Sequence, residues 1–250
     1  MILLVDIGNS RVKWAVLAEG TLTPQRAAAH AGWSVGDWRR ELLAHPGIRR
    51  VVAATVAGGA SAELLRQAVR TQLGCEVEFV TTSGAAAGVR NAYPDPRLLG
   101  VDRWLAVIAA HDVTHEPCCV VDVGTAATID AVTGDGQHLG GCIVPGPALM
   151  VSSLLQGTSD LEAHASSSVS VAGSLFANNT RDAIERGCVV ALAALADRAA
   201  QDLERMVGAV PTLLFTGGAA SLVAPYVRTP ARLVPDLVLQ GLAVLARIPR

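Results

Sequence analysis

Two short turns, each an aspartate and a glycine at the end of an apolar run, constrain this chain most. The first lies in "LLVDIGNSRVKW", with Asp6 and Gly8, and the second in "VVDVGTAATID", with Asp122 and Gly124. A glycine lets the backbone turn sharply and lets a phosphate approach the main-chain N–H groups. A carboxylate beside a phosphate needs a cation between them. One such turn is a common hairpin, but two, half a chain apart, predict a nucleotide held between two similar halves.

The segments around these turns predict an α/β fold in which each half starts with a hairpin. Strands are expected over Ile2–Asp6 and Val12–Leu17, and again over Cys118–Asp122 and Ala127–Val132. A third apolar run, "TLLFTGGAA" at 212–220, ends in another glycine turn that could lie under a purine or ribose. What recurs is therefore a half-chain unit rather than a short tandem repeat.

Further elements are expected on either side of these hairpins. Strands are predicted over Val51–Val56 and Val77–Val80, with helical periodicity between them. The clearest helix is predicted over 182–206, where Thr180 is placed to cap it. The Ser-rich segment 162–180 has little periodicity and is interpreted as a surface loop.

Composition limits the kinds of partner. The chain is 51% apolar and 17% charged, with a formal charge of −2 and a pI near 6.3, so nothing general favours nucleic-acid binding. "MILLVDIGNS" has no basic region before its apolar run, and the apolar stretch at 187–196 is shorter than the roughly 20 residues that span a bilayer. Five cysteines without a CxxC pair are interpreted as small buried hydrophobes. We therefore expect a cytoplasmic protein with no membrane segment.

Several motifs resemble those of known ATP-binding proteins. "DIGNS", "DVGTA" and "TGGAA" are similar to the phosphate-1, phosphate-2 and adenosine motifs of the actin/Hsp70/sugar-kinase (ASKHA) superfamily. "NAYPDPRLLGVDRW", at 91–104, resembles the signature of type III pantothenate kinases, a family also labelled Bvg accessory factors. The residues that match this signature are Asn91, Tyr93, Pro96, Leu99, Gly100, Asp102 and Arg103. "GGCIVPG" and "NNTRDAIERG" match the same family, so the resemblance covers nearly the whole chain in order.

The resemblance implies a fold and an activity. The fold would be two similar ribonuclease H-like domains, 1–112 and 113–250, with a nucleotide cleft between them. The activity would be ATP-dependent phosphorylation of pantothenate to 4'-phosphopantothenate, the first step of coenzyme A biosynthesis. Such a transferase uses ATP with Mg²⁺ and a monovalent cation, K⁺ or ammonium. The family also implies a homodimer with substrate sites shared across its interface.

The resemblance also implies roles for particular residues. Asp102 would be the general base. The substrate-binding residues would be Tyr93, Gly100, Val101, Asp102, Arg103 and Thr180, the last reaching the substrate of the neighbouring subunit. The ATP-binding residues would be Asp6, Ile7, Gly8, Asn9, Ser10, Arg11, Val12, Lys13 and Thr125. Asp6 would hold Mg²⁺ through water, and Asp122 would bind the monovalent cation.

Simpler interpretations of three of these residues stay open on the sequence alone. Asp102 could be a helix cap with a surface salt bridge to its neighbour. Tyr93 could be a packed loop aromatic, and Lys13 could lie on a solvated strand face. Two departures from the family pattern are Ser10, where many relatives have Thr, and the Ser/Ala-rich loop at 151–175.

Two other functions compete with pantothenate phosphorylation. The first keeps the fold and changes the substrate to a sugar or another small alcohol, against which "YPDPRLLGVDR" argues. The second is a non-catalytic, ATP-binding transcription accessory factor. The presence of Asp6, Asp102 and Asp122, and the lack of a basic stripe, favour an enzyme.

Overall fold

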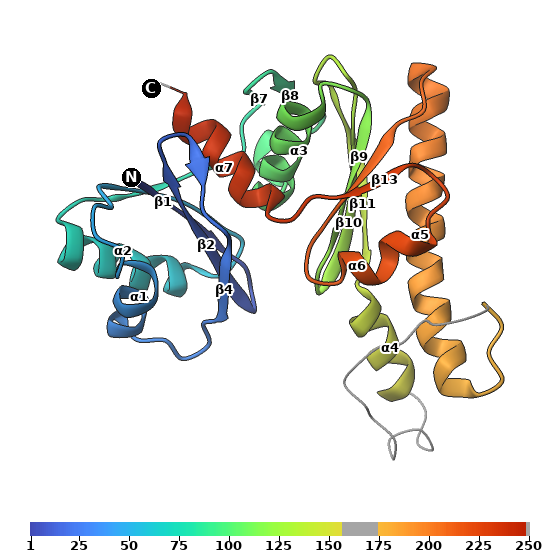
Figure 1. The fold of residues 1–250 in the computed structure, drawn as a ribbon, viewed down its shortest axis with the longest axis horizontal. Helices are drawn as coiled ribbons and strands as arrows, with labels where there is room; N and C mark the ends of the chain where they lie inside the picture. Colours follow the sequence, from blue (N-terminus) through green and yellow to red (C-terminus); the bar gives the residue numbers. More distant parts are fainter. Residues whose placement is uncertain (157–174, 249–250) are drawn as a thin grey trace. The chain divides into compact units, whose positions relative to one another are not determined.

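The computed structural model describes residues 1–156 and 175–248 (Figure 1). The chain divides into two units, one formed by Met1–Val113 with Asp236–Arg250 and the other by Thr114–Pro235. The polypeptide therefore returns to the first unit at its C-terminal end. The expected domains, 1–112 and 113–250, place the last helix in the C-terminal domain, whereas this division places it in the first unit.

The sheet of the first unit follows the order β3-β2-β1-β5-β6, with β4 also paired to β2. Its strands are β1 (Ile2–Ile7), β2 (Arg11–Ala18), β3 (Thr21–Leu22), β4 (Arg26–Ala29), β5 (Arg50–Thr55) and β6 (Val77–Phe79). β1 pairs antiparallel with β2 and parallel with β5. The expected hairpin at Asp6–Gly8 and the two expected later strands are thus confirmed.

One face of this sheet is covered by α1 (Val35–Leu42) and α2 (Gly59–Leu73) (Figure 1). Leu3, Val5 and Ile7 of β1 point to that face and are fully buried with Trp38 of α1. Because side chains alternate along a strand, Asp6 points to the opposite face. The apolar core on one face therefore fixes the direction of the aspartate on the other.

The opposite face of the first sheet carries α7 (Leu237–Arg247), which packs on β1, β2 and β5. Gly241 of α7 lies directly against the backbone of Leu105 in α3 (Val101–Thr114), where a Cβ would overlap the Leu105 carbonyl. A glycine inside a helix costs about 1 kcal/mol relative to alanine, and here it permits a close helix crossing. The crossing ties the C-terminal helix to the helix that carries Asp102 in its first turn.

The second unit repeats the topology of the first. Its sheet follows β11-β10-β9-β12-β13, the same third-second-first-fourth-fifth order as the first sheet without β4. Its strands are β9 (Cys118–Val123), β10 (Ala126–Val132), β11 (His138–Pro145), β12 (Thr212–Thr216) and β13 (Ala231–Leu233). The prediction of two similar ribonuclease H-like domains is confirmed by this repeat.

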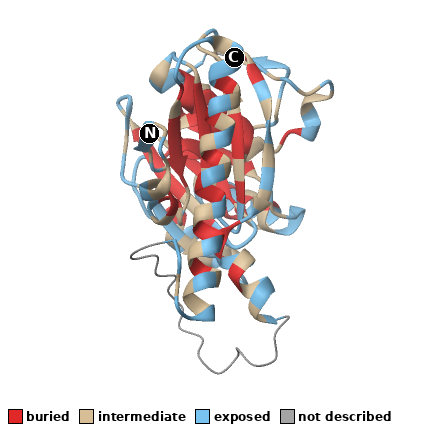
Figure 2. Cartoon of the chain, turned by 90° about the vertical axis from the view of Figure 1, so that its right-hand side faces the viewer, coloured by how far each residue is buried: buried red, intermediate tan, exposed pale blue. Residues whose placement is uncertain are grey.

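The long helix α5 (Thr180–Val207) covers the buried strands of the second sheet (Figure 2). Val189, Leu192 and Ala196 of α5 pack against strand residues such as Phe215. The side chain that caps α5 is Asn179, which accepts from the Asp182 amide at 2.9 Å, so the expectation that Thr180 is the cap is wrong. Thr180 is instead the first helical residue, where its hydroxyl has no capping role.

Connecting elements complete the units. They are β7 (Ala85–Ala86), β8 (Val89–Arg90), η1 (Pro96–Leu98), α4 (Pro147–Gln156), α6 (Ala220–Val223) and η3 (Ala224–Tyr226). None of the described helices is long and apolar enough to cross a membrane. Most of the Ser-rich segment, expected to be a surface loop, lies outside the described residues.

The five cysteines are free thiols, and three of them, Cys118, Cys119 and Cys188, are buried while Cys75 and Cys142 are partly exposed. Burial raises the pKa of the Cys118 thiol to about 11 and that of Cys119 to about 12. Such thiols stay protonated at neutral pH and act as small hydrophobes.

Candidate active site

The first turn links β1 to β2 and begins with a buried carboxylate. Asp6 is 7% exposed and lies opposite Lys13 of β2 in the antiparallel register. Lys13 is half-buried and shares the face of Asp6, because its neighbours Val12 and Trp14 point into the apolar core. Lys13 is therefore placed beside a carboxylate rather than on a fully solvated strand face.

The turn itself is held by one short backbone bond. The Gly8 amide donates to the Arg11 carbonyl at 3.0 Å, and a Cβ on Gly8 would lie 3.1 Å from that same oxygen. Asn9, Ser10 and Arg11 are exposed. A tight turn with exposed residues at the end of a buried strand is a geometry in which backbone amides can meet an anion.

The second turn has the same construction in the second unit. Asp122 is the last residue but one of β9 and lies opposite Thr128, and the Gly124 amide donates to the Ala126 carbonyl at 3.0 Å. The Gly146 amide donates to the Thr125 carbonyl at 2.9 Å. The Thr125 side chain is exposed. A Cβ on Gly146 would overlap the Gly124 carbonyl, so this brace requires glycine.

The third turn lies against the second. Gly217 follows β12 with φ of +92°, and a Cβ there would overlap the Asp122 carboxylate and the Val123 backbone. The Ala219 amide donates to the Val123 carbonyl at 3.0 Å. The segment that resembles an adenosine motif thus touches the residue that resembles a phosphate-2 aspartate, within one unit.

The loop at 91–100, which resembles the family signature, is held by hydrogen bonds between side chains and backbone groups of residues 82–99. Asn91 accepts from the Tyr93 amide at 2.9 Å and donates from Nδ2 to the Ser83 carbonyl at 3.2 Å. Thr82 donates to the Leu99 carbonyl at 2.9 Å. Asp95 caps η1, and its hydrogen bonds from Arg97 lower the pKa of that carboxyl. These bonds fix the loop that leads into α3.

Arg103 and Tyr93 form a pair at the end of this loop. Arg103 is 7% exposed and donates from Nη1 to the Tyr93 hydroxyl at 3.1 Å, with its guanidinium 5.9 Å from the ring centre. A buried guanidinium is a costly group unless it is bonded, so its burial favours a specific role. The expected alternative, a surface salt bridge between Asp102 and Arg103, does not fit, because the Arg103 side chain is buried and bonds Tyr93.

Asp102 lies in the first turn of α3 and is partly exposed. Its Oδ1 accepts from the Arg103 amide at 2.8 Å. A Cβ on Gly100 would lie 2.6 Å from that oxygen, so glycine lets the carboxylate fold back over the helix start. The second carboxylate oxygen is left as an acceptor.

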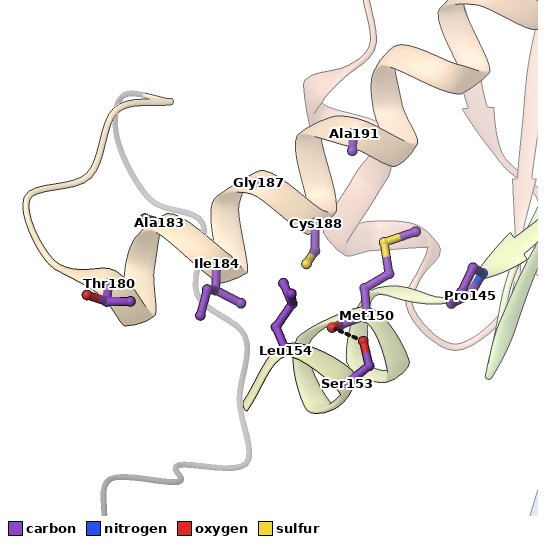
Figure 3. Close-up of a pocket in the computed structure, with 10 residues that line it drawn as sticks. All are labelled: Pro145, Met150, Ser153, Leu154, Thr180, Ala183, Ile184, Gly187, Cys188 and Ala191. Carbon is purple, nitrogen blue, oxygen red and sulfur yellow. Dashed lines mark hydrogen bonds between the residues drawn. The ribbon is translucent and has the colours of Figure 1, made fainter. Parts of the chain in front are cut away.

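Thr180 lines a groove between α4 and the start of α5 (Figure 3). The groove has a volume of about 570 Å³ and a largely apolar lining that includes Met150, Leu154, Ile184 and Cys188. Gly187 faces open space there, so the structure does not use it for close packing of α5 against another described helix.

The described residues contain no preformed cluster of metal ligands. Among residues 1–156 and 175–248, no group of three or more His, Cys, Asp or Glu side chains could hold a metal ion. A Mg²⁺ that enters with a nucleotide needs only one or two carboxylates, because phosphates and water fill its remaining positions. Asp6, a carboxylate at a strand end beside an exposed turn, fits that requirement.

A family model described as type III pantothenate kinase matches residues 2–202. The chain belongs to the type III pantothenate kinase family. It is 41% identical over 252 residues to a type III pantothenate kinase of Alkalilimnicola ehrlichii, with 98% of this chain and 97% of the relative covered. A type III pantothenate kinase of Nitrosococcus oceani is 37% identical over 253 residues, covering 99% and 94%.

Solved structures show the same fold at lower identity. A Baf family protein from Campylobacter jejuni has a TM-score of 0.59 at 23% identity, covering 98% of this chain and 97% of that one. The activator of 2-hydroxyisocaproyl-CoA dehydratase from Clostridium difficile, with bound ADPNP, has a TM-score of 0.51 at 13% identity, covering 98% and 93%. These neighbours confirm the ASKHA-type fold of this pantothenate kinase family member.

Proposed function

We propose that this chain transfers the γ-phosphoryl group of ATP to pantothenate and forms 4'-phosphopantothenate. The observation that carries this proposal is the family match over residues 2–202, which includes the segment that holds Asp102 at the start of α3. As a member of a kinase family, the chain uses ATP with a divalent metal ion. Phosphorylation of pantothenate is the first step towards coenzyme A.

Asp102 is the proposed general base. The 4'-hydroxyl oxygen forms a bond to the γ-phosphorus, the bond from that phosphorus to the β–γ bridging oxygen breaks, and ADP leaves. The hydroxyl proton passes to the Asp102 carboxylate, which has one oxygen held by the Arg103 amide at 2.8 Å. In-line phosphoryl transfer depends mainly on positioning and charge stabilisation, with a carboxylate as proton acceptor. The divalent ion would supply neutralisation of phosphate charge.

Arg103 and Tyr93 are the proposed contacts for the carboxylate and amide end of pantothenate. Arg103 donates from Nη1 to the Tyr93 hydroxyl at 3.1 Å, which helps to orient the guanidinium. Arginine suits carboxylate recognition because its donors form a planar fork. Gly100 and Val101 would contact the substrate through backbone, next to the base.

The Gly8 turn is the proposed phosphate site in the first unit. Ile7 to Val12 would approach the nucleotide, with exposed Asn9 and Ser10 at the tip, while Lys13 adds positive charge beside Asp6. Asp6 would hold Mg²⁺ through water. Thr125 is the proposed phosphate contact of the second unit, and its exposed side chain supports this role.

Asp122 is proposed to bind a monovalent cation, K⁺ or ammonium. Its position at the end of β9, against the Gly217 turn, gives a partly exposed carboxylate close to main-chain oxygen. Activity should rise on adding KCl or NH₄Cl to enzyme in a sodium-free buffer, and Asp122→Asn should remove that response. Equal rates with and without these salts would contradict the assignment.

A homodimer is also proposed, with Thr180 reaching the substrate of the partner subunit. Leu154, which lines the groove, is 51% exposed, and Leu175 and Phe176, a few residues before α5, are 52% and 85% exposed. Large exposed apolar side chains are more typical of an interface than of a free surface when they lie together. Light scattering after gel filtration should give twice the chain mass of 25.8 kDa. A mass of one chain at micromolar concentration would contradict it.

The activity is tested by incubating the protein with ATP, MgCl₂, KCl and either pantothenate or a panel of sugars and small alcohols. The proposal predicts ADP release and 4'-phosphopantothenate, identified by mass spectrometry, with pantothenate alone. Product from a sugar and none from pantothenate would establish the same fold with a different substrate. ATP binding with no product from any acceptor would favour a sensor.

A further inference from the structure

His30 lies outside every motif and yet contacts the first turn. It follows β4, is 9% exposed, and places Nε2 at 2.8 Å from the Gly8 carbonyl oxygen. The two residues are 22 positions apart in the sequence. A nearly buried imidazole is therefore aimed at the backbone of the turn that resembles a phosphate motif.

The geometry determines which ring nitrogen carries the proton. A carbonyl oxygen only accepts, so Nε2 must be protonated and must donate to Gly8. Nδ1 faces the Ser61 hydroxyl at 3.5 Å, and the ring lies against Trp38 with centroids 5.9 Å apart. Ser61 belongs to α2 and Trp38 to α1, so two helices hold the imidazole in this orientation.

The bond from His30 completes the restraint of the turn. The Gly8 amide is already tied to the Arg11 carbonyl at 3.0 Å, and the His30 bond ties the Gly8 carbonyl as well. In the part of the chain that the structure describes, neither Asn9 nor Ser10, which follow Gly8, is hydrogen-bonded to protein. With Gly8 fixed at both its polar groups, these next two amides are held in one orientation.

The corresponding turn of the second unit is also restrained at one amide and one carbonyl, but by backbone bonds alone. There the turn amide of Gly124 is tied to Ala126 at 3.0 Å, and the carbonyl of Thr125 is tied to the Gly146 amide at 2.9 Å. Both turns thus have one amide and one carbonyl restrained. In the second unit the carbonyl restraint is backbone, whereas in the first it is the His30 side chain.

We propose that His30 is a positioning residue for nucleotide phosphates, because it orients the Gly8–Ser10 turn through the Gly8 carbonyl. The proposal rests on the role proposed above for that turn in ATP binding. Preorganised amides bind an anion without first ordering the loop, so losing the restraint weakens affinity for the phosphates. The effect should fall on the nucleotide and spare pantothenate.

The test compares His30→Ala, His30→Gln and the wild type. His30→Ala should raise the KM for ATP roughly three- to tenfold, the usual effect of losing one hydrogen bond. The KM for pantothenate should stay within about twofold by the same reasoning. His30→Gln, whose amide can still donate to Gly8, should recover most of the loss. Calorimetry should show weaker binding of ADP and of a non-hydrolysable ATP analogue, with adenosine unchanged.

Matched controls separate this role from a general effect on folding. His45 is an exposed histidine of the same unit whose Nδ1 lies 2.7 Å from the adjacent Pro46 carbonyl oxygen. His45→Ala should leave both KM values unchanged, and circular dichroism should report whether each variant is folded. If His30→Ala does not fold, His30→Phe takes its place, because it keeps a planar ring and removes the Nε2 donor, and it should weaken nucleotide binding while His30→Gln keeps it.

Two results would overturn the proposal. One is an equal rise of both KM values in His30→Ala with no recovery in His30→Gln, which indicates general destabilisation. The other is unchanged nucleotide affinity in a folded His30→Ala protein. Failure of the underlying site assignment is distinguishable: Ser10→Ala would then leave the ATP KM unchanged in an otherwise active enzyme, whatever His30 does.

Discussion

The Arg103 guanidinium donates to the Tyr93 hydroxyl at 3.1 Å. Arg103 belongs to the first turn of α3, and Tyr93 to the loop after β8. Arg103 is almost fully buried, whereas Tyr93 is partly exposed. Tyr93 can therefore meet a substrate while it holds the arginine that would bind the substrate's charged end.

Tyr93→Phe removes the hydroxyl that accepts from Arg103 Nη1 and keeps the ring. We expect the KM for pantothenate to rise about three- to tenfold, since one hydrogen bond is lost and the guanidinium is less well oriented. The KM for ATP should not change. Steady-state kinetics with each substrate varied in turn measures both values, and an unchanged pantothenate KM would remove Tyr93 from the substrate site.

Gly217→Ala should destabilise the second unit. The new Cβ would overlap the Asp122 carboxylate and the Val123 backbone, and the residue has φ of +92°. Overpacking and a left-handed backbone together cost about 2–4 kcal/mol. Thermal unfolding should show a Tm lower by roughly 5 °C or more.

Gly218 provides the matched control for that substitution. It is the next residue along the chain, and a Cβ there meets nothing within 4 Å. Gly218→Ala should keep the Tm within about 1 °C of the wild type, as surface substitutions usually do. Equal losses of Tm in the two variants would mean that the close approach of Gly217 to Asp122 is not the reason why a side chain at residue 217 destabilises the protein.

Asp236→Asn should stabilise the protein at neutral pH. Asp236 precedes α7 with φ of +68° and makes no side-chain capping bond. Burial raises the pKa of its carboxyl, and the nearby Lys13 charge opposes that rise only in part. A carboxyl with a raised folded-state pKa favours folding when protonated, so the ionised form is unfavourable above that pKa. Asparagine removes the charge and tolerates the left-handed backbone.

The pH dependence of this gain is its check. Thermal unfolding at pH 7 should show a Tm higher by a few degrees in Asp236→Asn. The difference should shrink as the pH is lowered, because the wild-type carboxyl becomes protonated and loses its unfavourable charge. A difference that is constant from pH 7 to pH 4 would assign the gain to the backbone alone.

The hairpins and their Asp-Gly turns were predictable because apolar runs and glycine turns are local signals. Asp6 and Asp122 are each the last residue but one of their strands, since β1 and β9 both run one residue beyond the expected end. The return of α7 to the first unit was not predictable, since its sequence is apolar on several sides and fits either sheet. Gly241 is a local sign of a close crossing, but its partner, the Leu105 backbone, is distant in sequence.

The supports of the site were harder to predict than its reactive groups. Asp102 and Arg103 belong to a recognisable segment, but the imidazole of His30 reaches Gly8 only through the path of β4 and the start of α1. Likewise, the spacing Asn91-Tyr93 permits a turn held by the side chain, and only the structure shows that Asn91 also reaches Ser83. The cap at Asn179 rather than Thr180 depends on which residue leaves the helical backbone conformation first.

Asp102→Asn tests the central claim most directly. Asparagine keeps an oxygen that can accept from the Arg103 amide, as Oδ1 does now at 2.8 Å, but it cannot take a proton from the substrate hydroxyl. We predict a kcat lower by roughly 10²- to 10⁴-fold, the usual contribution of a general base, with ATP and pantothenate affinities by calorimetry within about twofold of wild type. A variant that forms 4'-phosphopantothenate at the wild-type rate would contradict the assignment of Asp102 as the base.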